Sequence, residues 1–66
     1  MKNNLKVERA RQRMSQQELA DRLHVSRQTI NAIELGKFNP STLLSLKMSR
    51  VFGVSVNELF FLEEGE

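Results

Sequence analysis

The chain has 66 residues, ten of them Lys or Arg and eight Asp or Glu, with one histidine and no cysteine. This length favours one domain near the lower size limit for an independent hydrophobic core, and the lack of cysteine excludes disulfides and thiolate metal sites and favours a reducing compartment. No apolar run approaches the roughly 18 residues of a membrane span, and the N-terminal stretch lacks the apolar segment of a signal peptide, so we expect a soluble cytoplasmic protein.

The charges are unevenly distributed along the chain. Residues 1–27 carry seven basic and three acidic side chains, residues 28–57 carry three basic and one acidic, and residues 58–66 carry four acidic and no basic side chains. The basic body fits a polyanionic partner, although many solvated helical surfaces have the same composition. Because a small chain without disulfides or metal often gains stability by self-association, we also expect a homodimer.

Helical spacing begins close to the N-terminus, and no stretch alternates apolar and polar residues long enough to predict a strand. We expect a first helix over residues 4–13. Its inward positions at helical spacing are Leu5, Arg9 (through its aliphatic stem), Ala10 and Met14.

A capping box marks the start of the second helix. The hydroxyl of Ser15 is placed to accept from a first-turn amide, while Glu18 reaches back to the backbone N–H of the cap. We expect this helix to end at Leu23, and its inward positions are Leu19, Ala20 and Leu23.

A third helix follows after a connection of only three residues, 24–26. Ser26 caps it, and we expect it to run over residues 27–35 until Gly36, which suits a left-handed C-terminal position. Its buried stripe consists of Ile30 and Ile33.

Two further helices complete the chain. The fourth is expected over residues 41–52, with Leu44, Met48, Val51 and Phe52 on one face and Gly53 at its end. A second capping box, Ser55 to Glu58, opens a short fifth helix that carries Val56, Leu59 and Phe60. The sequence therefore predicts an all-α fold, a compact five-helix bundle in one domain over residues 1–66. Its core covers about residues 5–60, and residues 61–66 form an apolar and then acidic tail.

The tight connection between the second and third helices predicts a steep crossing, as in a helix-turn-helix. With the isoleucine stripe facing inward, Arg27, Gln28, Asn31 and Ala32 lie together on the outer face of the third helix. The front of a recognition helix meets base edges in the major groove with this geometry. Arg pairs with guanine, Gln and Asn pair with adenine, and an alanine methyl contacts the thymine methyl, so we assign these four residues to base contacts.

Three segments together resemble the phage Cro/repressor (XRE-type) helix-turn-helix family, namely SQQELADRL, VSRQTINAIELGKFNP and LKMSRVFGVSVNELF. The resemblance covers about residues 5–60 and implies a lambda-repressor-like bundle that binds operator DNA. It also implies phosphate contacts from Gln16, Thr29, Lys37 and Asn39, and a structural ion pair between Arg9 and Glu34. One departure is His24, at a turn position where the family favours glycine because the backbone often has positive φ; histidine tolerates that region better than most residues.

Several apolar residues exceed what so small a bundle buries easily, and an exposed apolar patch often marks an interface. We assign Leu43, Leu46, Phe60, Phe61 and Leu62 to a dimer interface; the alternative for Phe61 is that it folds back over the core. A two-fold dimer would place two recognition helices about 34 Å apart on a palindromic site.

The predicted function is a homodimeric transcriptional regulator that binds double-stranded DNA, a repressor of prokaryotic or phage type. The alternative is an antitoxin or a protein-interaction module with the same fold. No catalytic residues are identified, because a serine nucleophile needs a base and an orienting group and the only histidine, His24, lies in a turn. We expect no cofactor, no metal and no membrane association.

Overall fold

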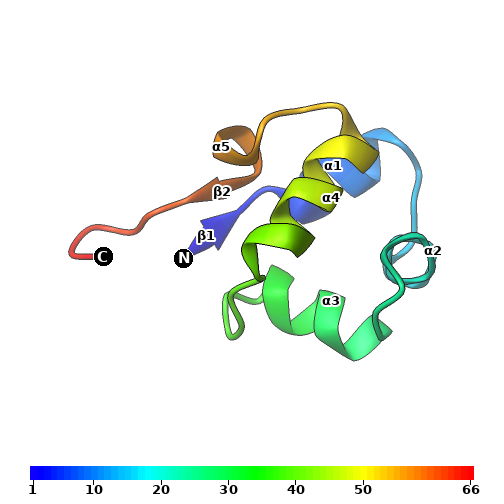
Figure 1. The fold of residues 1–66 in the computed structure, drawn as a ribbon, viewed down its shortest axis with the longest axis horizontal. Helices are drawn as coiled ribbons and strands as arrows, with labels where there is room; N and C mark the ends of the chain where they lie inside the picture. Colours follow the sequence, from blue (N-terminus) through cyan, green and yellow to red (C-terminus); the bar gives the residue numbers. More distant parts are fainter.

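The computed structural model describes residues 1–66 and contains five helices and two very short strands (Figure 1). The helices are α1 (Leu5–Arg11), α2 (Gln16–Leu23), α3 (Arg27–Glu34), α4 (Thr42–Phe52) and α5 (Val56–Leu59), and the strands are β1 (Lys2–Asn3) and β2 (Phe60–Phe61). The predicted five-helix fold is confirmed, with helix ends within two residues of the predicted ones at most positions.

Serine caps start four of the five helices. In each case the side-chain oxygen accepts from the backbone N–H three residues later, at Ser15, Ser26, Ser41 and Ser55. At α2 the Glu18 carboxylate also accepts from the cap's backbone N–H at 3.4 Å, which completes the predicted capping box. At α5 Glu58 makes no such return bond, so the second predicted capping box is only half formed.

Left-handed backbone conformations end three segments, of which those at His24 and Gly36 were expected. His24, at the end of α2, has φ 57° and ψ 42°, while Gly36 and Gly53 have φ 76° and 70°. Because a left-handed residue turns the chain sharply out of the helix, His24 sets the direction in which α3 leaves α2.

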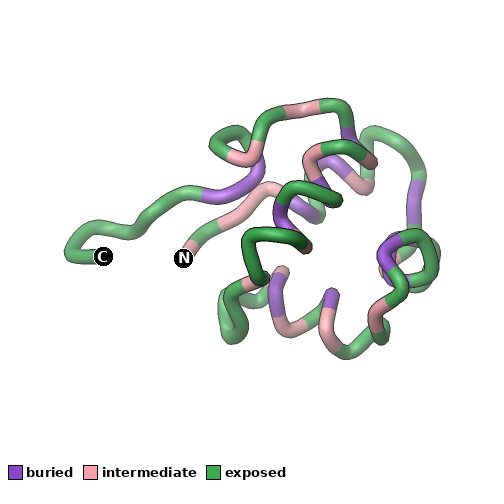
Figure 2. Tube along the Cα trace, viewed as in Figure 1, coloured by how far each residue is buried: buried purple, intermediate pink, exposed green.

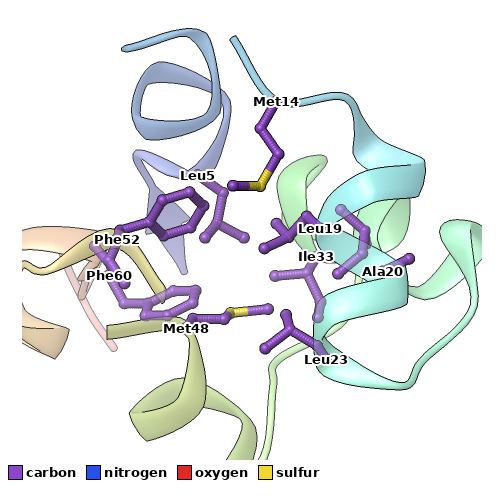
Figure 3. Close-up of a cluster of buried hydrophobic side chains, with 11 residues drawn as sticks. Leu5, Met14, Leu19, Ala20, Leu23, Ile33, Met48, Phe52 and Phe60 are labelled. Atoms are coloured by element: carbon purple, nitrogen blue, oxygen red, sulfur yellow. The ribbon is translucent and has the colours of Figure 1, made fainter. Parts of the chain in front are cut away.

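The hydrophobic core lies where α1, α2, α3 and α4 meet, closed on one side by α5 and β2 (Figure 3). Its members are Leu5, Met14, Leu19, Ala20, Leu23, Ile30, Ile33, Met48, Phe52, Leu59 and Phe60. Apart from Ala20, six of these side chains are completely or almost completely buried, and the burial of each stabilises the fold by about 1.5–3 kcal/mol. Leu44 and Val51, predicted to face inward from α4, are half-buried against this core.

The first helix differs from its prediction. It ends at Arg11, two residues early, and Arg13 follows with φ 52°. Ala10 is exposed, whereas Glu8 is almost fully buried. The reason is that Leu5, Glu8 and Arg9 share one face at i, i+3 and i+4, while Met14 reaches the core from the turn after the helix and not from an extension of it.

The two strands were not predicted. They pair in antiparallel fashion, with Lys2 opposite Phe61 and Asn3 opposite Phe60. Phe60 is therefore extended (φ −127°, ψ 137°) and lies after α5, not within it as predicted. A strand of two residues is too short to show an alternating pattern, and its pairing joins the two ends of the chain side by side (Figure 1).

Candidate nucleic-acid interface

The connection between α2 and α3 forms the predicted helix-turn-helix. The backbone N–H of Val25 donates to the carbonyl of Ala20 at 3.0 Å, which folds the turn back onto α2. Leu19 and Leu23 on α2 and Ile30 and Ile33 on α3 belong to the same buried core. Figure 2 shows the consequence for α3: its buried positions face the other helices and its exposed positions face away from them.

The predicted base-contact residues lie on this outer side of α3, with one difference. Arg27, Gln28 and Asn31 are exposed and together line a hollow of about 210 Å³. Ala32 is half-buried and therefore less accessible than the other three. Neither Arg27 nor Gln28 has a hydrogen-bond or ion-pair partner within the chain, which leaves both side chains available to an external ligand.

A larger polar groove of about 690 Å³ opens beside α3, between it and the first turns of α1 and α2. It is lined by Asn3, Lys6, Arg9, Ser15, Gln16, Gln17, Arg27, Asn31, Glu34 and Leu35, of which only Leu35 is hydrophobic. Lys6 and Gln17 were not among the predicted site residues. The sequence could not predict Lys6 as a site residue, because it lies on α1 and lines the groove only through the tertiary arrangement in which Arg9 on α1 pairs with Glu34 on α3.

An ion pair between α1 and α3 forms the inner wall of this groove. Arg9 Nε lies 2.6 Å from Glu34 Oε2, and Arg9 Nη2 lies 2.9 Å from Glu34 Oε1. Arg9 Nη1 also donates to the carbonyl of Met14 at 2.9 Å. The hydrogen bonds that Arg9 donates to the Glu34 carboxylate raise the pKa of Arg9 above its ordinary value, against the opposing effect of burial. The pair is the one that the family resemblance implies.

The ion pair continues into a network of amides. Gln16 Nε2 donates to Glu34 Oε1 at 3.2 Å and to Asn31 Oδ1 at 3.1 Å. Gln16 is half-buried at the start of α2, and Asn31 is exposed one turn after the start of α3. The network therefore leads from the buried ion pair outward to the exposed face of α3.

The remaining predicted phosphate contacts are placed around this face. Thr29 is half-buried, and its hydroxyl lies 2.9 Å from Ser26 Oγ. Lys37 and Asn39 are exposed in the loop after α3, where the Lys37 backbone N–H donates to the carbonyl of Ala32 at 2.9 Å. The Lys37 ammonium has no carboxylate partner within the chain.

The predicted dimer residues divide into two groups. Leu43, Leu46 and Leu62 are exposed to 64%, 56% and 74%, and Phe61 to 37%. Phe60, in contrast, is 8% exposed and belongs to the core, so little of its ring is available to a second chain. Three more large apolar residues are exposed that were not assigned to an interface, namely Val7, Leu35 and Phe38.

The structure contains no cluster of three or more His, Cys, Asp or Glu side chains able to hold a metal ion. None of its helices has both the length and the apolar character needed to cross a membrane.

Comparison with known proteins assigns a family to this arrangement. A helix-turn-helix family model matches residues 5–59. The chain is 48% identical over 66 residues to an uncharacterized HTH-type transcriptional regulator of Methanocaldococcus jannaschii, with both chains covered completely. It is 45% identical over 64 residues to the uncharacterized HTH-type transcriptional regulator YgzD of Bacillus subtilis, with 97% of each chain covered. A crystal structure of the hypothetical transcription factor NHTF from Neisseria superposes with a TM-score of 0.76 at 27% identity, over 83% of this chain and 62% of that longer one.

Proposed function

Because this chain belongs to the helix-turn-helix family, we propose that it is a sequence-specific DNA-binding transcriptional regulator that acts as a homodimeric repressor on a palindromic operator. The single observation that carries the proposal is the outer side of α3, where Arg27, Gln28 and Asn31 stand exposed beside a polar groove. These cationic and amide side chains suit a ligand that is anionic and has polar base edges, as duplex DNA does.

The base contacts are proposed from the chemistry of the exposed side chains. Arg27, free of any carboxylate, can donate two parallel hydrogen bonds to O6 and N7 of a guanine. Gln28 can donate to N7 and accept from the N6 amino group of an adenine. The exposed part of the Ala32 methyl group suits a thymine methyl.

The phosphate contacts surround these residues. Lys37 and Asn39 follow α3 at its C-terminal end, Thr29 lies in its first turn, and Gln16 at the start of α2 contacts Asn31 and Glu34 of α3. Lys6, which lines the same groove as Arg27, adds a further cation. Contacts of this kind orient the protein on the duplex and supply affinity without sequence preference.

A homodimer is proposed from the exposed apolar residues. Leu43 and Leu46 lie one turn apart on α4, and Phe61 and Leu62 lie where the chain leaves the bundle. A two-fold pairing of such a surface would set two copies of α3 about 34 Å apart, one turn of the duplex. A dimer bound to such an operator within a promoter would block the access of RNA polymerase. This repression would take place in the cytoplasm.

Selection of preferred duplexes from random DNA tests the proposal. We expect the purified chain to enrich a palindromic sequence whose half-sites are centred about 10 base pairs apart. Enrichment of a single asymmetric half-site would contradict the dimer, and recovery of no preferred sequence would contradict specific recognition.

A further inference from the structure

One face of α4 combines exposed apolar and basic side chains. Leu43, Leu46, Lys47 and Arg50 follow one another at i, i+3, i+4 and i+7, so they share one side of the helix. All four are exposed, and neither Lys47 nor Arg50 has a carboxylate within ion-pair distance. The face is therefore apolar toward the start of α4 and cationic toward its end.

Two hollows lie beside this face, between α4 and the turn that follows α2. The first, of about 290 Å³, has mainly apolar lining residues, among them Leu43 and Leu44, and is also bordered by Lys47. The second, of about 300 Å³, is bordered by the cations Arg22, Lys47 and Arg50. Because Lys47 borders both hollows, an apolar site passes directly into a cationic one along the direction of α4.

The C-terminal segment carries the complementary side chains in the same order. Phe61 and Leu62 are followed by Glu63 and Glu64, and Leu62 is 74% exposed. Neither glutamate has a cation within ion-pair distance. Four residues in extended conformation span about 10 Å, and two turns of a helix such as α4 cover about the same distance. The segment therefore matches the α4 face in length, polarity and charge.

The C-terminal segment is held away from α4 of its own chain. Phe61 pairs with Lys2 in the two-stranded sheet, and the Glu66 carboxylate lies 3.2 Å from the amino group of Met1. Between these two anchors the chain projects beyond the bundle (Figure 1) and is exposed along its whole length (Figure 2). Both the segment and the α4 face are thus open to a second copy of the chain.

We propose, on the basis of the homodimer in the proposed function, that residues 61–64 of one protomer lie along α4 of the other. Leu62 enters the apolar hollow, and Glu63 and Glu64 pair with Lys47 and Arg50. The exchange is reciprocal, because in a two-fold dimer each protomer gives one segment and receives one.

The test reverses the charges on each side of this contact in the full chain. One variant carries Lys47→Glu with Arg50→Glu, and the other carries Glu63→Lys with Glu64→Lys. Like charges then face each other, so the dissociation constant of each variant's dimer should rise more than about tenfold. Sedimentation equilibrium should show monomers at a concentration where wild type is dimeric, and circular dichroism should show that both variants keep their helices. Double reversals are used because removal of a single exposed ion pair changes the constant by less than about fivefold per pair.

A mixture of the two variants separates contact between chains from contact within one chain. In a mixed dimer, the lysine-bearing segment of one chain meets the glutamates on α4 of the other, and the native segment meets the native cations. Both contacts are then attractive, so native mass spectrometry of the mixture should show heterodimers. The matched control is one chain with all four reversals, which keeps the wild-type net charge of +2 and should dimerise as wild type does.

Three outcomes would overturn the proposal. Dimers that survive both double reversals would exclude this contact and leave the homodimer and the DNA binding of the proposed function standing. A mixture that stays monomeric would show that the segment does not cross between chains. A wild-type chain that is monomeric at every concentration would refute the proposed homodimer as well, and would leave the α4 face to a partner other than this chain.

Discussion

Arg9 and Glu34 face each other through two hydrogen bonds of 2.6 and 2.9 Å, with side chains exposed to only 13% and 7%. The pair joins α1 to the last turn of α3, 25 residues apart in the sequence. Because Glu34 also accepts from Gln16 on α2, one carboxylate connects three helices. The orientation of α3 therefore depends on an ion pair at its C-terminal end.

Removal of Arg9 should destabilise the fold more than removal of an exposed cation. Arg9→Ala leaves the nearly buried Glu34 carboxylate without its cation, and we expect the free energy of unfolding to fall by about 2–4 kcal/mol in urea denaturation. The matched control is Arg11→Ala, because Arg11 is 70% exposed and lies 3.6 Å from Glu8, so its loss should change stability by less than about 1 kcal/mol. Equal effects of the two substitutions would contradict a clamping role for Arg9.

The same pair should be insensitive to moderately alkaline pH. The pKa of Arg9 is raised in the folded state, so its stabilising contribution is fully present below the unfolded pKa and is lost only as pH rises through the folded value. We therefore expect the stability difference between wild type and Arg9→Ala to be the same at about pH 7 and about pH 9. A difference that shrinks over this interval would show that another group titrates with the pair.

Arg27 should determine sequence preference. Arg27→Ala is expected to weaken binding to the selected operator by about 1–3 kcal/mol and to reduce discrimination against unrelated duplexes in gel-shift competition. Arg50→Ala is a control of equal charge, because Arg50 is exposed on α4 and does not line the groove beside α3. If both variants lose affinity equally on specific and unrelated DNA, Arg27 acts only as a cation.

Lys37 should act on affinity and not on sequence. Its ammonium is exposed and unpaired in the loop after α3, so Lys37→Ala is expected to weaken all duplexes alike. The slope of log Kd against log salt concentration should fall by about 0.9, the value for one phosphate contact. Lys47→Ala, on α4, provides the comparison, and an unaltered slope for Lys37→Ala would remove Lys37 from the phosphate contacts.

Local chemistry explains which features of the fold were predictable. The serine caps and the left-handed Gly36 after α3 depend on residues within a few positions of one another, so their signals are present in the sequence itself. The left-handed conformation of His24 was expected only from the family resemblance. The burial of Ile30 and Ile33 follows from helical spacing alone.

The unpredicted features depend on contacts between distant residues. The Asn3 side chain donates to the carbonyl of Ile33 at 2.8 Å, and the pairing of β1 with β2 joins residues almost 60 positions apart. Lys6 enters the groove, and Asn31 obtains its orientation from Gln16, only because three helices converge. Residue type assigned Asn31 to the outer face of α3, but its hydrogen bond with Gln16 is apparent only in the packed structure.

Disruption of the exposed leucines of α4 should separate dimerisation from folding. Leu43 and Leu46 are 64% and 56% exposed, so Leu43→Glu and Leu46→Glu remove little packing within one chain and their thermal midpoints at low concentration should stay close to wild type. If these residues form the dimer interface, each carboxylate would be buried there without a partner, which is strongly unfavourable. Sedimentation equilibrium should then show monomers, and affinity for the full palindrome should fall toward that for a single half-site.

The control for this prediction is Val7→Glu, which adds the same charge at a 48% exposed position of α1 and should remain dimeric. Leucine variants that sediment as wild type does would exclude this face of α4 from the dimer interface and leave Phe61 and Leu62 as the candidates.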